Sequence, residues 1–294
     1  MNAIQQKTNF HRKEALLVFI SLFLIFLYHF SMIIFPCFST VYSSLTKWNG
    51  IGTKHFIGFG NYIRLFKDPA FYFALLNNVK WMLLFISIPI LFSLVIGYVI
   101  SKKDKGILVL RTCYFLPYII SAAVAGKIFA TFFNPIFGMN LFFDNIGLEF
   151  LKRQWLSPDN SLVTVAFVDM WHWWGFLLVI FLSALQQIDK SLYECADIEG
   201  CNEFQKWFYI TIPSIKSTII FILLVTIVWS FSTFDYIWVM TKGGPGSEIL
   251  STLLYKNALF TYKAGYSCSM SVFQGLLAAL VFIIFGIFRK KMED

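Results

Sequence analysis

Charged side chains are scarce in this chain of 294 residues: 14% of them are Asp, Glu, Lys or Arg, whereas an ordinary soluble domain carries about 25%. Hydrophobic residues reach 58%, and the mean hydropathy is +0.69. This composition excludes an ordinary soluble domain and predicts a protein of the lipid bilayer. The net charge of +8 is scattered through the segments between apolar runs, so we expect no nucleic-acid partner.

Motifs for metal binding, covalent catalysis and nucleotide hydrolysis are missing. The five Cys form no Cys-x-x-Cys pair, and their odd number argues against a disulfide framework. The four His are dispersed, and neither His-Glu-x-x-His nor Gly-x-Ser-x-Gly occurs. Gly126-Lys127 lacks the earlier Gly and the following Ser or Thr of a phosphate-binding loop. We therefore expect no metal, no bound cofactor, no ATP site and no enzymatic activity in this chain.

Six apolar stretches are long enough to cross the membrane, which takes about 20 residues of helix. They lie at 15–39, 74–101, 107–133, 160–185, 214–240 and 268–288. The first is too long for a signal peptide and has no small-residue cleavage site, so we expect it to remain as a span. The sequence thus predicts an N-terminal segment at 1–14 and a single all-α integral membrane domain with six transmembrane helices at 15–294.

The basic residues predict the orientation of these spans. Lys102, Lys103, Lys105 and Arg111 crowd one short loop, and the sequence Arg-Lys-Lys at 289–291 directly follows the last span. Clusters of Lys and Arg beside spans stay on the cytoplasmic side. We therefore place both termini, and with them the loop at 186–213, in the cytoplasm.

The loop at 186–213 has more pattern than a plain connection between spans. A helix over 190–199 is expected to end at Gly200, because Gly tolerates the positive φ of a sharp reversal. A second helix at about 203–210 presents aromatic side chains beside Lys206, and Pro213 begins the next span. Such a segment suits the cleft of a protein partner. An amphipathic helix lying on the lipid surface is the alternative.

This pattern resembles the EAA loop of ABC-importer permeases. The residues that agree with the family form are Glu194, Ala196, Gly200, Phe208, Ile210 and Pro213, and those that depart from it are Cys195, Glu199 and Cys201. In that family the helix pair inserts into a groove on a separate ATPase and moves with it as a unit. By this resemblance, coupling to the ATPase rests on Glu194, Ala196, Asp197, Glu199, Gly200, Phe204, Trp207 and Pro213.

A second pattern resembles the carbohydrate branch of the same permeases, and within it the subunit type of the larger maltose-transporter permease. It runs from Phe234-Asp235 through Gly243-Gly244-Pro245 to Gly265-Tyr266, and Leu116-Pro117-Tyr118 adds a further agreement. The likeness covers 110–294 well and the preceding part only by its number of spans. It implies the type I importer permease architecture with a cytoplasmic coupling loop.

Spans four and five carry the candidates for a substrate pathway. A sugar needs flat rings against its C–H faces and polar groups for its hydroxyls. Helical spacing and the likeness to maltose-type permeases indicate six positions, and two carboxylates join them because a charge inside a membrane should face a cavity or a partner. These residues are Asp169, Trp173, Phe176, Thr226, Trp229, Ser230, Thr233 and Asp235. Packing and hydrogen bonds between helices are the alternative roles for the aromatic and hydroxyl groups, and capping of a turn is that of Asp235.

The resemblance implies a permease subunit of an ATP-driven importer for a carbohydrate, an oligosaccharide in particular, in a bacterial plasma membrane. The chain would form half of an alternating-access pathway and couple through 190–213. Its implied partners are a second homologous permease subunit, two copies of a cytoplasmic ABC ATPase that uses ATP and Mg²⁺, and an extracellular or periplasmic solute-binding protein. A secondary, ion-coupled transporter is the alternative; it predicts inverted repeats, and we find none in the sequence. Which sugar is carried, and whether it is neutral or anionic, stays open.

Overall fold

A computed structural model describes the backbone of residues 2–102 and 106–293, with side chains for 16–102 and 106–287. Lys103 and Lys105 of the predicted basic cluster, the side chains of the predicted segment 1–14 and those of the basic run 289–291 lie outside the described residues. Over the described part, the chain is helical apart from one pair of two-residue strands, and it forms two compact units.

The first unit comprises residues 1–65 and 257–272. Its elements are α1 (Asn2–His29), a π-helical turn (Phe30–Ile34), α2 (Phe35–Ser44), the antiparallel strands β1 (Thr46–Lys47) and β2 (His55–Phe56), and α3 (Gly60–Leu65). From Leu16 onward, α1, the π-helical turn and α2 are largely apolar, and nearly every side chain from 16 to 42 is exposed. A helix of this kind needs lipid or another membrane helix around it.

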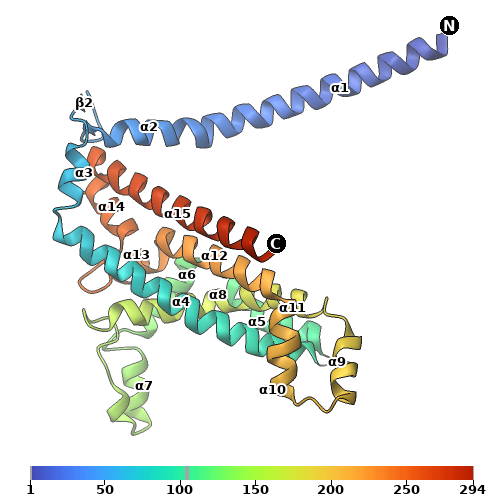
Figure 1. The fold of residues 1–294 in the computed structure, drawn as a ribbon. Coiled ribbons are helices and arrows are strands. Elements are labelled where there is room, and N and C mark those ends of the chain that lie inside the picture. The colour runs from blue at the N-terminus through green and yellow to red at the C-terminus, as the bar shows by residue number, and fades with distance from the viewer. Residues whose placement is uncertain (1, 103–105, 294) are drawn as a thin grey trace. The chain divides into compact units, whose positions relative to one another are not determined.

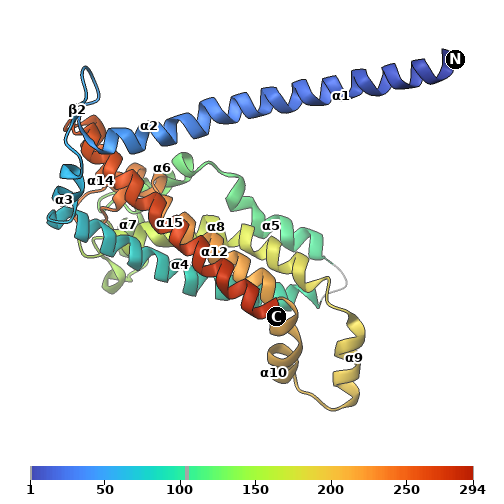
Figure 2. The same ribbon diagram turned by 45° about the horizontal axis from the view of Figure 1, so that its top comes forward.

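The second unit comprises residues 66–256 and 273–294. Its elements are α4 (Pro69–Ser101), α5 (Ile107–Ile119), α6 (Ala122–Phe132), α7 (Met139–Asn145), a 3-10 turn (Glu149–Leu151), α8 (Ser161–Leu185), α9 (Lys190–Ile198), α10 (Glu203–Lys206), a π-helical turn (Trp207–Thr211), α11 (Ile212–Ser214), α12 (Lys216–Ser232) and α13 (Asp235–Thr241). Along the chain, α14 (Leu250–Leu259) and α15 (Ala264–Glu293) each pass from one unit to the other. In both ribbon views α9 and α10 project from one end of the second unit, away from α7 (Figure 1, Figure 2).

Among the described residues, four helices are long and apolar enough to cross a membrane: Leu16–Ser44, Pro69–Ser101, Ser161–Leu185 and Ala264–Ile287. Two bent pairs of helices bring the number to six if each pair counts as one span. The predicted third span at 107–133 is one such pair, with α5 and α6 at 86° to each other. The predicted fifth span at 214–240 is interrupted twice, because α12 begins only at Lys216 and ends at Ser232.

The core of the second unit forms around α8, which packs against α4 and α5. Leu177, Phe181 and Leu182 of α8 are buried, and Gly175 lets the backbone of α5 approach closely. Polar bonds add to the packing: Asn78 of α4 donates to the Ser230 carbonyl oxygen at 2.9 Å and accepts from a backbone N–H of α14 at 2.9 Å. In a membrane, close packing and such hydrogen bonds hold helices together. This core fixes the three helical faces that surround the pocket described next.

Candidate functional site

A pocket of about 410 Å³ lies where α5 gives way to α6, beside the middle of α8 and the break between α12 and α13. Its lining residues are Tyr118, Ile119, Ile120, Ser121, Ala122, Asp169, His172, Trp173, Trp229, Ser232, Thr233, Phe234, Asp235 and Tyr236. The elements that supply them are far apart in the sequence but belong to one compact unit. Ligand pockets in proteins enclose about 300–1,000 Å³, so the volume suits a small part of a sugar chain.

Two interrupted helices shape this pocket. At the first interruption Ile120 is extended, with ψ 132°, and Ser121 caps α6 by accepting a hydrogen bond from the Val124 N–H at 3.4 Å. The Ile120 carbonyl lies 3.0 Å from Nε2 of His172, which bridges the break to α8. At the second interruption Thr233 and Phe234 leave helical geometry, with ψ 140° and φ −149°. At each break, side chains that a straight helix would direct elsewhere are turned toward the pocket.

Aromatic rings form one wall of the pocket. The indoles of Trp173 on α8 and Trp229 on α12 stack with centroids 4.7 Å apart and planes at 8°. Tyr118 stacks on Phe176 at 5.1 Å, and Trp173 lies 4.9 Å from the same phenyl ring. Stacked pairs of this kind are rigid, because each ring blocks the rotation of the other. They give the pocket an aromatic wall beside its polar groups.

Asp169 and its neighbours form the polar side of the pocket. Asp169 has no exposed surface, and neither carboxylate oxygen accepts a hydrogen bond from any described residue. The hydroxyl of Tyr236 and Nε1 of Trp173 are likewise buried with no partner in the described part of the chain. Asp235, the first residue of α13, is exposed and close enough for its charge to act on Asp169. A buried charge normally requires a charged or hydrogen-bonding partner. The polar groups of this cluster are therefore available to bind a ligand.

The predicted pathway residues divide into two groups. Five of them line the pocket: Asp169, Trp173, Trp229, Thr233 and Asp235. The other three, Phe176, Thr226 and Ser230, do not line it. The Ser230 hydroxyl donates to the Thr226 carbonyl at 2.7 Å, and both residues are buried in the helix packing. The predicted stripe on span five ends at Ser230, because Thr233 already lies beyond the last residue of α12.

Sequence reasoning missed three polar contributors to the pocket: Ser121, Ser232 and Tyr236. It noted Tyr118 only as part of a motif, although the preceding Pro117, which lies in the last turn of α5, is a sequence signal for a nearby helix break. No comparable signal marks the break after Ser232, where neither Gly nor Pro occurs. Lys80 and Lys127, the basic residues within the predicted spans two and three, do not line the pocket.

A second candidate site is the hairpin of α9 and α10, called here the coupling hairpin (190–214). Asp189 caps α9 by accepting from the Ser191 N–H at 2.9 Å, and these hydrogen bonds hold the pKa of the Asp189 carboxyl below its usual value. Asn202 and Gln205 form a reciprocal capping box at the start of α10. Gly200, which lies between α9 and α10, has φ +73°, as predicted for a reversal. The local sequence thus specifies both helix starts and the turn.

One side of the coupling hairpin exposes large apolar side chains. Ile198 is 85% exposed, Phe204 71% and Tyr209 79%. The rings of Phe204 and Phe208 touch, with centroids 4.5 Å apart. Glu194 and Glu199 are also exposed, whereas Ala196 is buried. An exposed apolar cluster rimmed by carboxylates is typical of a protein-docking surface.

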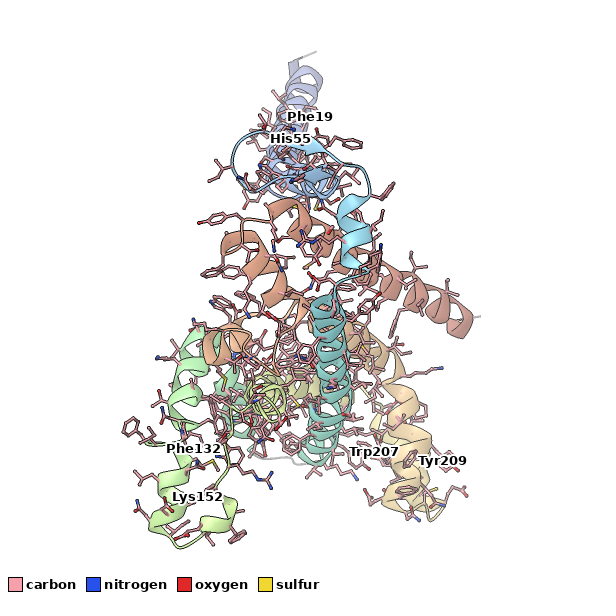
Figure 3. The ribbon with its side chains drawn as sticks, turned by 90° about the vertical axis from the view of Figure 1, so that its left-hand side faces the viewer. Phe19, His55, Phe132, Lys152, Trp207 and Tyr209 are labelled. Atoms are coloured by element: carbon pink, nitrogen blue, oxygen red, sulfur yellow. The ribbon has the colours of Figure 1, made fainter. Side chains whose placement is uncertain are left out.

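The other side packs on the end of α4, and here the structure differs from the prediction. Trp207 was expected to face outward with Phe204 beside Lys206; instead its ring contacts Tyr98 of α4 at 4.5 Å. Figure 3 shows Trp207 toward α4 and Tyr209 on the far side of the helix. Lys206 is buried and pairs with Asp197 and Glu203, and Lys102 of α4 pairs with the same Glu203. Burial lowers the pKa of Lys102 from its usual value.

The second half of the coupling hairpin also differs from the single helix that was expected at 203–210. It is α-helical only to Lys206, continues as a π-helical turn and ends at Ser214. Pro213 lies in that last turn, and the span itself begins at Lys216 after a bend of 69°. Pro213 therefore precedes the bend instead of opening the span, where its missing N–H removes no bond from α12.

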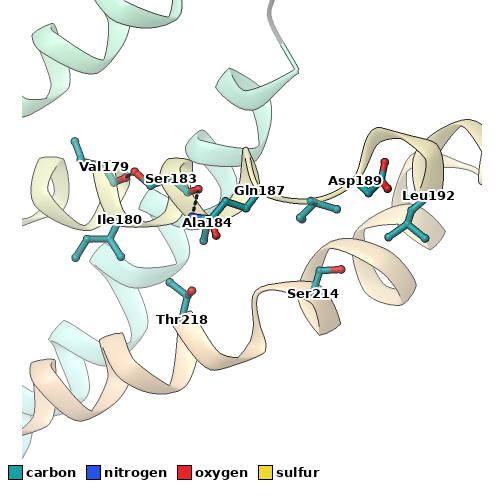
Figure 4. A pocket seen from close by; sticks show the side chains of 10 residues that line it. Val179, Ile180, Ser183, Ala184, Gln187, Asp189, Leu192, Ser214 and Thr218 are labelled. Atoms are coloured by element: carbon teal, nitrogen blue, oxygen red, sulfur yellow. Dashed lines mark hydrogen bonds between the residues drawn. The ribbon is translucent and has the colours of Figure 1, made fainter.

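A larger cavity of about 660 Å³ lies between the end of α8 and the start of α12. Figure 4 shows Ser183 on α8, and Gln187 just beyond its end, across from Thr218; Gln187 donates to the Ser183 carbonyl at 3.2 Å. The Ser183 hydroxyl in turn donates to the Val179 carbonyl at 2.8 Å. Because these polar groups already have partners within α8, this cavity is a weaker candidate for ligand binding than the pocket around Asp169.

The chain thus combines membrane-length helices, a polar pocket at two helix breaks and an amphipathic hairpin at one end, as expected for a membrane permease. The comparison with known families agrees. The chain belongs to the family described as binding-protein-dependent transport system inner membrane component, which matches residues 15–294.

Individual relatives are permeases as well. The probable ABC transporter permease protein YurN of Bacillus subtilis is 35% identical over 256 residues, 85% of this chain and 86% of the relative. The arabinooligosaccharides transport system permease protein AraP of Halalkalibacterium halodurans is 32% identical over 238 residues, 78% of this chain and 73% of the relative.

Solved structures show the same fold. A chain from a bacterial ABC transporter involved in the import of the acidic polysaccharide alginate superposes with a TM-score of 0.84 at 21% identity, covering 96% of this chain and 98% of that one. A chain from a bacterial alginate ABC transporter in complex with alginate pentasaccharide-bound periplasmic protein superposes with a TM-score of 0.84 at 20% identity, covering 95% of this chain and 96% of that one.

Family membership confirms the predicted class. The chain is a multi-pass, all-α inner-membrane permease subunit of an ABC importer, and the EAA loop is a property of the family. Such subunits are not enzymes, because a separate subunit hydrolyses ATP. Nothing in the comparisons supports the secondary-transporter alternative.

Proposed function

We propose that this chain is the permease subunit of an importer for carbohydrate, an oligosaccharide in particular, and that the pocket around Asp169 is its part of the substrate pathway. The observation that carries the proposal is the combination of a stacked Trp173–Trp229 wall with buried, unpartnered polar groups in one pocket. Aromatic faces bind the C–H surfaces of sugar rings, and carboxylate and hydroxyl groups bind sugar hydroxyls. The printed names of relatives such as AraP support the substrate class.

Within this proposal the predicted residues take different parts. Trp173, Trp229, Thr233, Asp169 and Asp235 contact substrate from the pocket wall. Phe176, Thr226 and Ser230 act one layer behind: Phe176 supports the ring of Tyr118, the Ser230 carbonyl bonds α12 to α4, and Thr226 is buried in the same packing. This division predicts that substitutions in the first group change substrate binding more than those in the second.

We further propose that the coupling hairpin docks on an ATPase subunit through Phe204 and its exposed neighbours. Glu194, Ala196, Asp197, Glu199, Gly200 and Pro213 shape and rim this surface, and Trp207 anchors it to α4. Because Lys206, Glu203 and Lys102 tie the hairpin to α4, a displacement of the hairpin moves α4 with it. Such rigid-body transmission is an ordinary route from a docked motor to a membrane domain.

The proposal extends to the assembly around this chain. One subunit offers one coupling hairpin, so two ATPase copies require a second, homologous permease subunit, and the pocket of each chain forms half of the pathway. ATP and Mg²⁺ are used by the ATPase, and a solute-binding protein delivers the sugar from outside. Both termini and the hairpin then face the cytoplasm of a plasma membrane, which agrees with Lys102 and Arg111 at that end.

The test is the ATPase activity of the reconstituted complex, with and without loaded solute-binding protein. Gly200→Pro should abolish stimulation by substrate while all subunits still co-purify, because φ +73° is closed to proline. Gly106→Pro is a matched control, since Gly106 has φ +81° and open space around it but lies outside the hairpin. If no ATPase subunit co-purifies with the wild-type chain, the proposal fails and an ion-coupled carrier replaces it.

A further inference from the structure

We propose that the pocket around Asp169 selects a saccharide that carries a protonated amine, and that Asp169 is the counter-ion of this ammonium group. This inference rests on the proposed function of the chain as a sugar permease and adds the charge of its cargo. Neither the family nor the relatives determine that charge. The argument has three steps, which concern the unpaired charge, its surroundings and the shape of the remaining pocket.

The first step is that Asp169 lacks any compensation from the described residues. It lies in the middle of α8, has no exposed surface and accepts no hydrogen bond from them. A carboxylate at such depth costs about 2.5–3.5 kcal/mol on insertion scales. The buried Lys206 is the contrasting case, because two carboxylates accompany it. The charged form of Asp169 therefore takes its partner from outside the described residues.

The second step is the sign of the surrounding charge. The pocket lining contains a second carboxylate, Asp235, and neither Lys nor Arg. Nε2 of His172 is directed to the Ile120 carbonyl oxygen at 3.0 Å, so this ring is already engaged. An acidic sugar would bring its own carboxylate against two others, with repulsion strengthened by the low dielectric of the site. A cationic sugar meets attraction from both.

The third step separates an organic cation from a metal ion. Among the described residues no group of three or more His, Cys, Asp or Glu side chains is arranged to hold a metal. Two carboxylates beside a stacked indole pair suit an ammonium group, which binds to carboxylates and to aromatic faces alike. The unpartnered donors, the Tyr236 hydroxyl and Nε1 of Trp173, remain for the ring oxygens and hydroxyls of the sugar. Together these groups match a glycoside with one amine.

The experiment measures direct binding to the assembled, purified membrane complex in the absence of the solute-binding protein, so that the selectivity of that protein does not enter. The probes are the glucosamine trisaccharide, its fully N-acetylated form and the galacturonate trisaccharide, each followed by quenching of tryptophan fluorescence. The pH is kept below the pKa of the sugar amine. We expect the amine form to bind roughly tenfold more tightly than the acetylated form, and the galacturonate not to bind.

Asp169→Asn is the decisive variant, because it keeps the shape of the side chain and removes its charge. The preference for the amine over the acetylated form should fall to near unity, with the melting temperature unchanged or raised. Asp235→Asn is the matched control; its side chain is exposed, so the preference should fall only in part.

Equal binding of the amine and acetylated forms by the wild type, or a preference that survives Asp169→Asn, would overturn this inference. The proposed function would remain intact in that case, since a neutral sugar would still occupy the pocket. Failure of the proposed function has a different signature, namely absence of the ATPase subunit or of stimulation by any loaded solute-binding protein.

Discussion

Gly175 on α8 offers the sharpest test of the packing that holds the pocket together. A Cβ atom added there would lie 2.1 Å from the Tyr114 carbonyl oxygen, 2.9 Å from the Tyr114 carbonyl carbon and 3.0 Å from the Phe115 Cα. Ordinary contacts to a Cβ begin at 3.4 Å. The obstacle is backbone, which cannot rotate aside as a side chain would. Gly175→Ala must therefore push α5 away from α8 by about an ångström or more.

The expected cost is considerable for a single methyl group. Overpacking of a filled interior costs about 1–3 kcal/mol, and we expect the upper end because the contact is between two backbones. At about 2–4 °C per kcal/mol, the melting temperature of the detergent-purified complex should fall by several degrees. Since α5 carries Tyr118 into the pocket, ligand binding should weaken as well.

The assay is thermal unfolding followed by fluorescence-detected gel filtration, with Gly275→Ala as the control. Gly275 lies inside α15 and an added Cβ would meet nothing within 4 Å. Replacing a helical Gly in open space by Ala gains roughly 0.5–1 kcal/mol, so this variant should equal or exceed the wild type. A Gly175→Ala protein with the wild-type melting temperature would refute the reasoning.

Three further predictions concern the coupling hairpin. Gly200→Ala should destabilise the turn by about 1–2 kcal/mol and Gly200→Asn by less, seen as faster amide exchange over 190–206. Phe204→Ala should weaken ATPase co-purification about fivefold or more without lowering the melting temperature. Trp207→Ala should instead lower the melting temperature, because the Trp207 ring packs on Tyr98. Equal effects of the two substitutions would contradict the assignment of Phe204 to the docking face and Trp207 to the α4 face. Lys206→Met should be nearly neutral for stability, while changing both of its carboxylate partners to amides should cost at least about 1 kcal/mol, since a buried cation is then left unpaired.

Length and hydrophobicity were enough to predict the membrane-length helices, because the thickness of the bilayer fixes how many apolar residues each needs. The coupling hairpin was predictable for a different reason: Gly200 is the residue type that its turn requires, and its capping residues act locally. The burial of Lys206 was not predictable, because its partner Asp197 reaches it only across the folded turn. The orientation of Trp207 was not predictable either, because it faces α4 through a π-helical turn that shifts the register of the second half of the coupling hairpin.

The pocket itself was predictable only in part. Asp169 stood out because a lone charge within an apolar span is rare. Nothing in the sequence separates Ser230, whose hydroxyl serves its own helix, from Thr233, which lines the pocket. The difference arises from the break after Ser232, which no Gly or Pro announces. A uniform helical wheel drawn through this region therefore puts both residues on one face.

The two helix breaks have a consequence for how the pathway closes. Peptide groups around Ile120 and Thr233 lie outside regular helix, and in a membrane such groups are tolerated only inside protein or beside water. Any of these groups that no protein atom satisfies must therefore meet water while the pocket is empty. A pocket that holds water in the absence of substrate does not serve as the barrier to ions and protons. The seal must be made above or below it, by apolar side chains that part and rejoin as the transporter works.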